Sequence, residues 1–108
     1  MILWVDDIRP APKTHYTNFK VYIPVRSVNE AKSLISDLTY KGFGDAIEYI
    51  DIDHDAGEYA KYGGDYIELL NWLEETGRNY PIHIHSMNVV GRENMRRIIQ
   101  RNGWEEVR

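Results

Sequence analysis

The chain of 108 residues contains no cysteine, which excludes disulfide bonds, thiolate metal sites and thiol catalysis. It also lacks any run of the roughly eighteen consecutive apolar residues that would predict a membrane-spanning helix. The first residues, MILWVDD, become acidic too early to resemble a signal peptide. These absences predict a soluble, cytoplasmic protein with no membrane partner.

Positive charge is sparse as well, with a net charge of −4 and no run of Lys or Arg longer than two. Non-specific binding to duplex nucleic acid depends on a basic face that neutralises phosphates. The composition therefore argues against a duplex DNA partner. Arginines are nevertheless concentrated in the C-terminal third, where they could meet a phosphate end: Arg92, Arg96, Arg97, Arg101 and Arg108.

Strand and helix patterns alternate along what is predicted to be a single domain over residues 1–108. Apolar runs predict strands at residues 2–5, 20–25, 46–52, 81–85 and 104–107. Amphipathic spacing predicts helices between Ser27 and Gly42, between Asp65 and Gly77, and over 92–102. The order predicts an α/β fold with a flavodoxin-like parallel five-stranded sheet, order 2-1-3-4-5, and helices on both faces. The link between the first two strands is short, so the first helix is predicted to be reduced or missing.

Polar residues follow three of these strands at the point where each strand ends. They are Asp6 and Asp7, then Asp53, His54 and Asp55, then His85 and Ser86. Ligands of an open parallel sheet bind outside the carboxyl ends of its strands, so these groups predict a functional site at one rim. The alternative is that strand-end carboxylates only cap helices or face water.

Several of these residues have a structural reading beside the functional one. The carboxylate pair Asp6 and Asp7 fits a cation such as Mg²⁺, or a simple turn. His85 is placed for acid–base work, for phosphate contact or for a structural role. His83 lies mid-strand, which favours a packed, hydrogen-bonded histidine. Asp51 points away from its apolar neighbours and could pair with a basic residue under a helix; we assign it no functional role.

A second group of residues is suited to binding an anion. Asn88, Gly91 and Arg92 lie where a helix begins, and exposed backbone amides there attract phosphate. Ser86 offers a hydroxyl that could donate to phosphate or stabilise a turn. Arg9 follows the acidic pair and could bind phosphate or neutralise those carboxylates.

The segments LWVDDIRPAP, IDIDHDAG and IHIHSMNVVGRENM resemble the cyclic-phosphate processing receiver family, a divergent branch of the response-regulator receiver fold. The resemblance extends from Asp6 to Met95. It implies a receiver-like fold and a metal site at Asp6, Asp7 and Asp53, with Ser86 at the position of the receiver Ser or Thr. The lysine that ordinary receivers carry after their last strand is missing, because this chain ends in WEEVR.

The resemblance further implies hydrolysis of cyclic phosphates on nucleotides or RNA ends, with Mg²⁺ or Mn²⁺ as cofactor. His54 and His85 would serve as general base and acid beside Asp53, since imidazole titrates near neutral pH. The phosphate-binding candidates are Arg9, Ser86, Asn88, Gly91 and Arg92. Asp55 is left as a further metal ligand, an orienting group for His54 or the start of a turn. The alternative function is a degenerate receiver that acts as a phosphoacceptor or a partner-binding signalling module.

Overall fold

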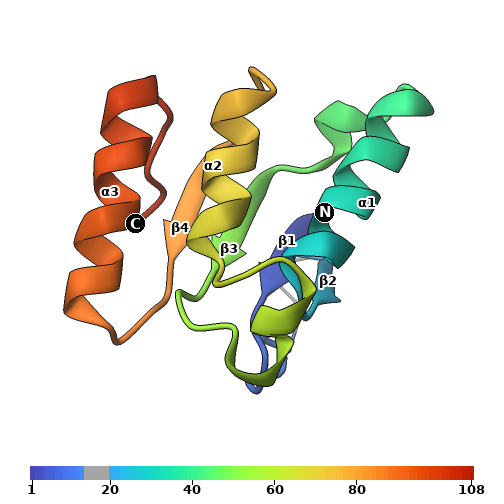
Figure 1. The fold of residues 1–108 in the computed structure, drawn as a ribbon. Helices are drawn as coiled ribbons and strands as arrows, with labels where there is room; N and C mark the ends of the chain where they lie inside the picture. The colour runs from blue at the N-terminus through green and yellow to red at the C-terminus, as the bar shows by residue number, and fades with distance from the viewer. Residues whose placement is uncertain (14–19) are drawn as a thin grey trace.

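The computed structural model describes residues 1–13 and 20–108 and shows a parallel sheet with helices packed against it (Figure 1). The elements are β1 (Ile2–Val5), β2 (Tyr22–Val25), α1 (Val28–Tyr40), the 3₁₀ helix η1 (Gly44–Ala46), β3 (Tyr49–Ile52), the 3₁₀ helix η2 (Gly57–Tyr62), α2 (Ile67–Glu75), β4 (Ile82–Ile84) and α3 (Val89–Asn102). All pairings are parallel and the strand order is β2-β1-β3-β4. The α/β class and the order of these four strands are therefore confirmed.

The predicted fifth strand is wrong for the described part of the chain. Residues 104–107 contribute only an isolated parallel bridge between Glu106 and Ile82. Trp104 is buried, but Glu106 turns its carboxylate to Arg96 of α3. A single bridge with charged residues around it does not extend into a ladder, since Glu and Asp are poor strand formers. The sheet consequently ends at β4.

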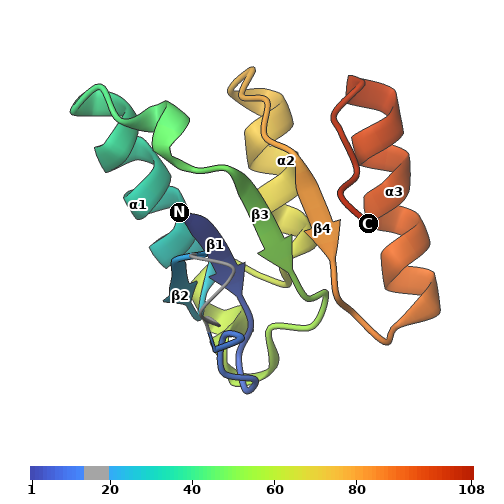
Figure 2. The same cartoon turned by 180° about the vertical axis from the view of Figure 1, so that it is seen from behind.

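The helices of residues 1–13 and 20–108 cover one face of the sheet, whereas the sequence predicts helices on both. Figures 1 and 2 show α1 and α2 on the same side of the strands, with α3 beside α2. Successive right-handed crossovers from β2 to β3 to β4 all place their helices on one side. On the other face, residues 1–13 and 20–108 include no helix. No helix in the described residues is long and apolar enough to cross a bilayer.

The predicted reduction or loss of the first helix concerns the link between β1 and β2. Residues 14–19 of that link lie outside the described residues, so this prediction is not confirmed. The first helix that the structure describes, α1, has a full 13 residues and starts as the sequence predicts. The Ser27 side chain accepts a hydrogen bond of 3.1 Å from the Glu30 amide, as expected for the N-terminal half of a capping box.

The core fixes the level at which the strands end. Leu3, Ile50 and Ile82 are in register across three strands and are fully buried in the core cluster. Two residues further along β1 and β3, Val5 and Ile52 are paired and buried in the same way. Each such side chain stabilises the fold by about 1.5–3 kcal/mol relative to exposure. Because this register is held so firmly, the next residues of neighbouring strands must emerge together at one rim.

Candidate functional site

The backbone ladder continues one residue past the strand ends. The Asp6 amide donates to Val25, the Asp53 amide to Val5 and the His85 amide to Ile52, at 3.0–3.3 Å. Since side chains alternate between faces, Asp6, Asp53 and His85 share the helix-free face with residues two positions earlier. The polar rim is thus a continuation of the sheet rather than a set of independent loops.

His85 is held between two carboxylates. Its Nδ1 lies 2.6 Å from Asp51 Oδ1 and its Nε2 lies 2.8 Å from Asp6 Oδ2. Ionised carboxylates only accept hydrogen bonds, so this geometry suits an imidazolium that donates from both nitrogens. Burial by itself would lower the pKa of His85, but Asp51 and Asp6 together raise it above its ordinary value. The Trp4 ring stacks on the imidazole with centroids 4.1 Å apart and planes 2° apart.

Asp51 is the residue whose part in this site the sequence analysis missed. It is only 5% exposed, and its partner is His85 on the helix-free face rather than a basic residue under a helix. The period-two alternation that places Asp51 on the same face as Asp53 was a usable signal. The register between Asp51 and His83 brings β4 alongside it, so that His85 can reach back to the carboxylate.

Asp6 organises the turn after β1. Its Oδ1 accepts hydrogen bonds from the amides of Ile8 at 2.9 Å and Arg9 at 2.8 Å. Burial would raise the pKa of Asp6, but these amides and His85 hold it below its ordinary value. Arg9 is exposed, and its carbonyl accepts a hydrogen bond from Trp4 Nε1 at 2.9 Å.

Asp6, Asp53 and His85 form a group that could hold a metal ion, and we call it the rim cluster. One ligand atom from each lies within 4.8 Å of the others. Carboxylate oxygens suit Mg²⁺ and Mn²⁺, while an imidazole nitrogen is a better ligand for Mn²⁺ than for Mg²⁺. For His85 to be a ligand, its nitrogen must first lose the proton that it shares with Asp6.

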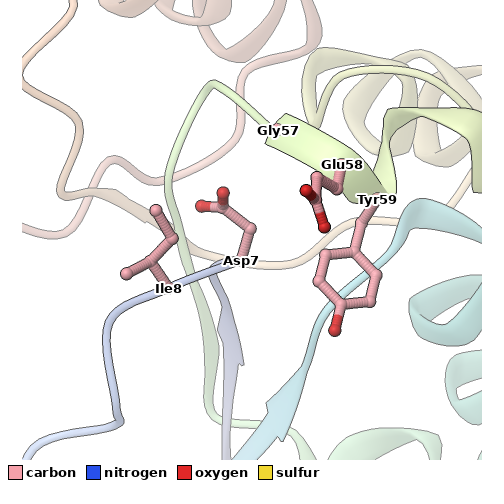
Figure 3. Close-up of a pocket in the computed structure, with 5 residues that line it drawn as sticks. All are labelled: Asp7, Ile8, Gly57, Glu58 and Tyr59. Atoms are coloured by element: carbon pink, nitrogen blue, oxygen red, sulfur yellow. The ribbon is translucent and has the colours of Figure 1, made fainter.

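Asp7 lies outside the rim cluster and faces a pocket of about 280 Å³, which we call the Tyr59 pocket (Figure 3). Ile8, Gly57, Glu58 and Tyr59 line it together with Asp7. Partial burial raises the pKa of the Asp7 carboxyl, and the negative charges of nearby aspartates raise it further. Those charges belong to Asp6, Asp53 and Asp55. The four aspartates therefore repel one another, which is what a cation would relieve.

His54 is positioned by a different set of contacts. Its Nδ1 lies 3.0 Å from Asp55 Oδ1, and the Asn88 amide nitrogen donates to Asp55 Oδ2 at 3.4 Å. The ring packs over Gly91 so closely that a Cβ atom at that position would collide with it. Asp55 thus contacts His54, one of the three arrangements that the sequence left open.

A family model described as the cyclic-phosphate processing receiver domain matches residues 1–101. The chain belongs to the cyclic-phosphate processing receiver domain family. No curated protein and no solved structure matches the chain. The resemblance carried by the three sequence segments is thereby confirmed as a family membership.

The remaining predicted residues of this receiver domain lie near the start of α3. Ser86 is 4% exposed and its hydroxyl accepts a hydrogen bond from the Asn88 amide at 3.1 Å. Asn88 caps the helix, with its side-chain oxygen accepting from the Gly91 amide at 2.9 Å. That amide therefore already has a partner, so phosphate at this helix end would meet the Asn88 side chain first. Arg92 lies one turn further and lines a separate cavity.

Proposed function

We propose that this receiver domain hydrolyses a 2′,3′-cyclic phosphate on a nucleotide or an RNA end. The observation that carries the proposal is a pair of histidines near the carboxyl ends of the strands, each bound to a carboxylate. His54 contacts Asp55, and His85 contacts Asp51. Opening a cyclic phosphodiester with water requires one group to take a proton and another to give one. The family description agrees with this substrate class.

In the proposed reaction His54 is the general base. A neutral ring that donates from Nδ1 to Asp55 keeps a lone pair on Nε2, which can accept a proton from water. The His54 side chain is 15% exposed, so water can approach it. The water oxygen bonds to phosphorus as one ester P–O bond of the five-membered ring breaks.

His85 is the proposed general acid. As an imidazolium it can release its Nε2 proton, now donated to Asp6, to the departing ribose oxygen. One proton is taken by His54 and one is supplied by His85, so the product is a phosphomonoester beside a free hydroxyl. Asp51 keeps the ring oriented throughout through the bond to Nδ1.

Asp6 and Asp53 are the proposed ligands of a divalent cation, Mg²⁺ or Mn²⁺, with Asp7 and Asp55 as nearby carboxylates. Such a cation would neutralise charge on the non-bridging phosphate oxygens. Partial burial raises the pKa of Asp7, the charges of Asp6, Asp53 and Asp55 raise it further, and that repulsion supports a cation at this rim. Arg9, at an exposed turn beside the cluster, is the proposed contact for the same oxygens, together with Ser86 and Asn88.

The test is turnover of an oligonucleotide that ends in a 2′,3′-cyclic phosphate, with Mn²⁺ or Mg²⁺ present. His54→Ala and His85→Ala should each lower the rate by about two orders of magnitude, the usual scale for a general acid or base. Asp45→Asn, an exposed carboxylate at the opposite end of β3, is the control and should match wild type. Equal rates in all four proteins would refute the assignment.

The second candidate is phosphate acceptance by Asp53 in a signalling role. Asp53 belongs to the rim cluster, where a cation beside the carboxylate would favour phosphoryl transfer. Incubation with acetyl phosphate and incubation with the cyclic-phosphate oligonucleotide separate the two candidate functions. A stable phosphoryl adduct after acetyl phosphate treatment, seen by intact mass and lost in Asp53→Asn, would favour the signalling role. Turnover of the cyclic phosphate would favour hydrolysis.

A further inference from the structure

A second cavity, of about 150 Å³, opens at the β4 edge of the sheet between α3 and the residues that follow it. We call it the arginine pocket. Its ionisable lining residues are His83, Arg92, Arg96, Glu106 and Arg108. None of them lines the Tyr59 pocket or belongs to the rim cluster. The arginine pocket is therefore separate from the site described above.

The fold brings these residues together from three segments. Arg92 and Arg96 are four residues apart on α3 and so project from the same side of the helix. The C-terminal segment is tied to β4, because the Val107 amide donates to the Ile82 carbonyl at 2.7 Å. His83 Nδ1 donates to the Val107 carbonyl at 2.8 Å, which fixes this histidine in the wall of the pocket.

The positive charge of the pocket is only partly neutralised. Arg96 Nε donates to both Glu106 oxygens at 3.0–3.1 Å, and Arg108 lies 4.0 Å from the same carboxylate. Glu106, the one carboxylate in the lining, is thus shared between two guanidinium groups, and Arg96 is also paired with Glu93 outside the lining at 3.0 Å. Arg92 Nε is buried and has no hydrogen-bond partner among the described residues. A buried donor without an acceptor is unfavourable, and native structures rarely leave one.

We propose that the arginine pocket binds a phosphate group. The ligand must be negative and rich in acceptors, and a guanidinium fork matches the oxygens of a phosphate. The volume is about five times the roughly 30 Å³ that one water molecule occupies in the liquid. It is below the roughly 300 Å³ at which pockets begin to hold a drug-sized molecule. The pocket therefore has room for a phosphate group.

The position of the pocket indicates which phosphate this is. His83 and His85 lie on the same face of β4, about 6.6 Å apart at roughly 3.3 Å per residue. A phosphate in the arginine pocket would therefore be a neighbour of the one at the rim. On the basis of the proposed function, it is the adjacent phosphodiester of an RNA strand, so the substrate is an oligonucleotide end rather than a mononucleotide.

The first test titrates inorganic phosphate into the wild-type chain in EDTA, observed by ¹⁵N–¹H NMR. The Arg92 Nε–H resonance and the amides of His83 and Val107 should shift together. Arg92→Gln should weaken phosphate binding at least tenfold, whereas Arg97→Gln, an exposed arginine on the same helix, should leave it unchanged. Arg92→Lys, which keeps the charge without the fork, should bind with intermediate affinity. A wild-type protein in which none of these resonances shifts would overturn the proposal.

The second test compares adenosine 2′,3′-cyclic phosphate with a trinucleotide that ends in the same group, again in EDTA so that only binding is measured. The trinucleotide should bind at least tenfold more tightly to wild type, and Arg92→Gln should abolish that difference. If inorganic phosphate binds but the trinucleotide has no advantage, the pocket takes free phosphate and the backbone assignment is wrong. These binding readouts do not depend on turnover, so an inactive protein that still binds phosphate would refute only the proposed function.

Discussion

Around His85, three side chains that are far apart in the sequence act on one imidazole ring. Asp6 and Asp51 bind its two nitrogens and Trp4 covers its face. A ring with both nitrogens bound cannot rotate without breaking a charge-assisted hydrogen bond. The His85 orientation is therefore fixed before any substrate binds, which is the condition for efficient proton transfer.

The central prediction at this scale concerns Asp51. Asp51→Asn keeps the shape of the side chain but removes the charge that holds His85 as an imidazolium. We expect the rate of cyclic-phosphate hydrolysis to fall by about 10–100-fold, the usual effect of losing a residue that orients a functional histidine. The pH–rate profile should also shift to lower pH on its alkaline limb. Asp45→Asn should change neither quantity, and an Asp51→Asn enzyme with the wild-type profile would contradict this role.

The same contacts predict how stability depends on pH in the metal-free protein. The folded-state pKa of His85 is raised, so its stabilising contribution is complete below the ordinary histidine value of about 6.5 and is lost as the pH rises through the folded-state pKa. In EDTA, the difference in unfolding free energy between wild type and His85→Gln should shrink as the pH rises above the ordinary histidine pKa of about 6.5. Urea titrations of the two proteins at a series of pH values measure this difference in unfolding free energy. A difference that grows with pH would show that the folded protein holds the His85 ring neutral.

Sequence alone could place Asp6, Asp53 and His85 at one rim because each lies at, or directly after, the last residue of a predicted strand. Topology then determines which strand ends are neighbours. Asp51 could not be assigned in this way. It lies inside the apolar run, and its meaning depends on a partner 34 residues later whose side chain reaches back toward β3.

Among the elements, α3 has the closest connection to the site. Asn88 caps the helix and also contacts Asp55, while Gly91 makes room for the His54 ring. This helix begins at Val89, three residues before the predicted start at residue 92, a difference that arises because Val89 and Val90 are exposed and do not fit an amphipathic stripe. The helix predicted between Asp65 and Gly77 begins at Ile67, and the Asp65 carboxylate lies before it and accepts a hydrogen bond from the Ala56 amide.

Two helix caps give a matched pair of variants at this scale. Asn88→Ala removes the cap of α3 and the contact with Asp55, whereas Ser27→Ala removes only the cap of α1. Both should lower the unfolding free energy by about 1 kcal/mol, the usual value of such a cap. Only Asn88→Ala should also reduce turnover, because the Asp55–His54 pair loses its support. Equal turnover in the two variants would show that α3 serves the fold alone.

For the molecule as a whole, the placement of helices on one face has a direct consequence for the site. The opposite face carries Trp4, Asp51 and His85. A helix packed against that face would have to bury its apolar side chains against the charged pair of Asp51 and His85. Sequence periodicity identified three helices, although α3 begins three residues earlier than predicted, and it predicted helices on both faces of the sheet where the described helices cover one. That placement follows from the strand order, because the right-handed crossovers from β2 to β3 and from β3 to β4 run in the same direction along the sheet.

The aspartates at the rim predict how the whole domain responds to a divalent cation. Burial raises the pKa of Asp7 and the charges of Asp6, Asp53 and Asp55 raise it further, so Asp53→Asn should relieve part of this repulsion and leave the metal-free protein at least as stable as wild type. A cation at one hundred times its dissociation constant should stabilise wild type by about 2.7 kcal/mol. For a domain of this size that is an increase in Tm of about 10–20 °C.

Thermal unfolding with Mn²⁺, with Mg²⁺ and with EDTA tests this response. Wild type and Asp45→Asn should gain stability with Mn²⁺, whereas Asp53→Asn should not. If Asp53→Asn only damaged the fold, its Tm in EDTA would be lower than that of wild type. A Tm in EDTA that is unchanged or higher, together with no gain in Mn²⁺, therefore indicates the loss of a metal ligand. A response in Asp53→Asn as large as in wild type would place the cation away from the rim cluster. In that case the charge of the aspartates would have to be offset without a cation, by His85, which donates from Nδ1 to Asp51 and from Nε2 to Asp6, and by the backbone amides that donate to Asp6.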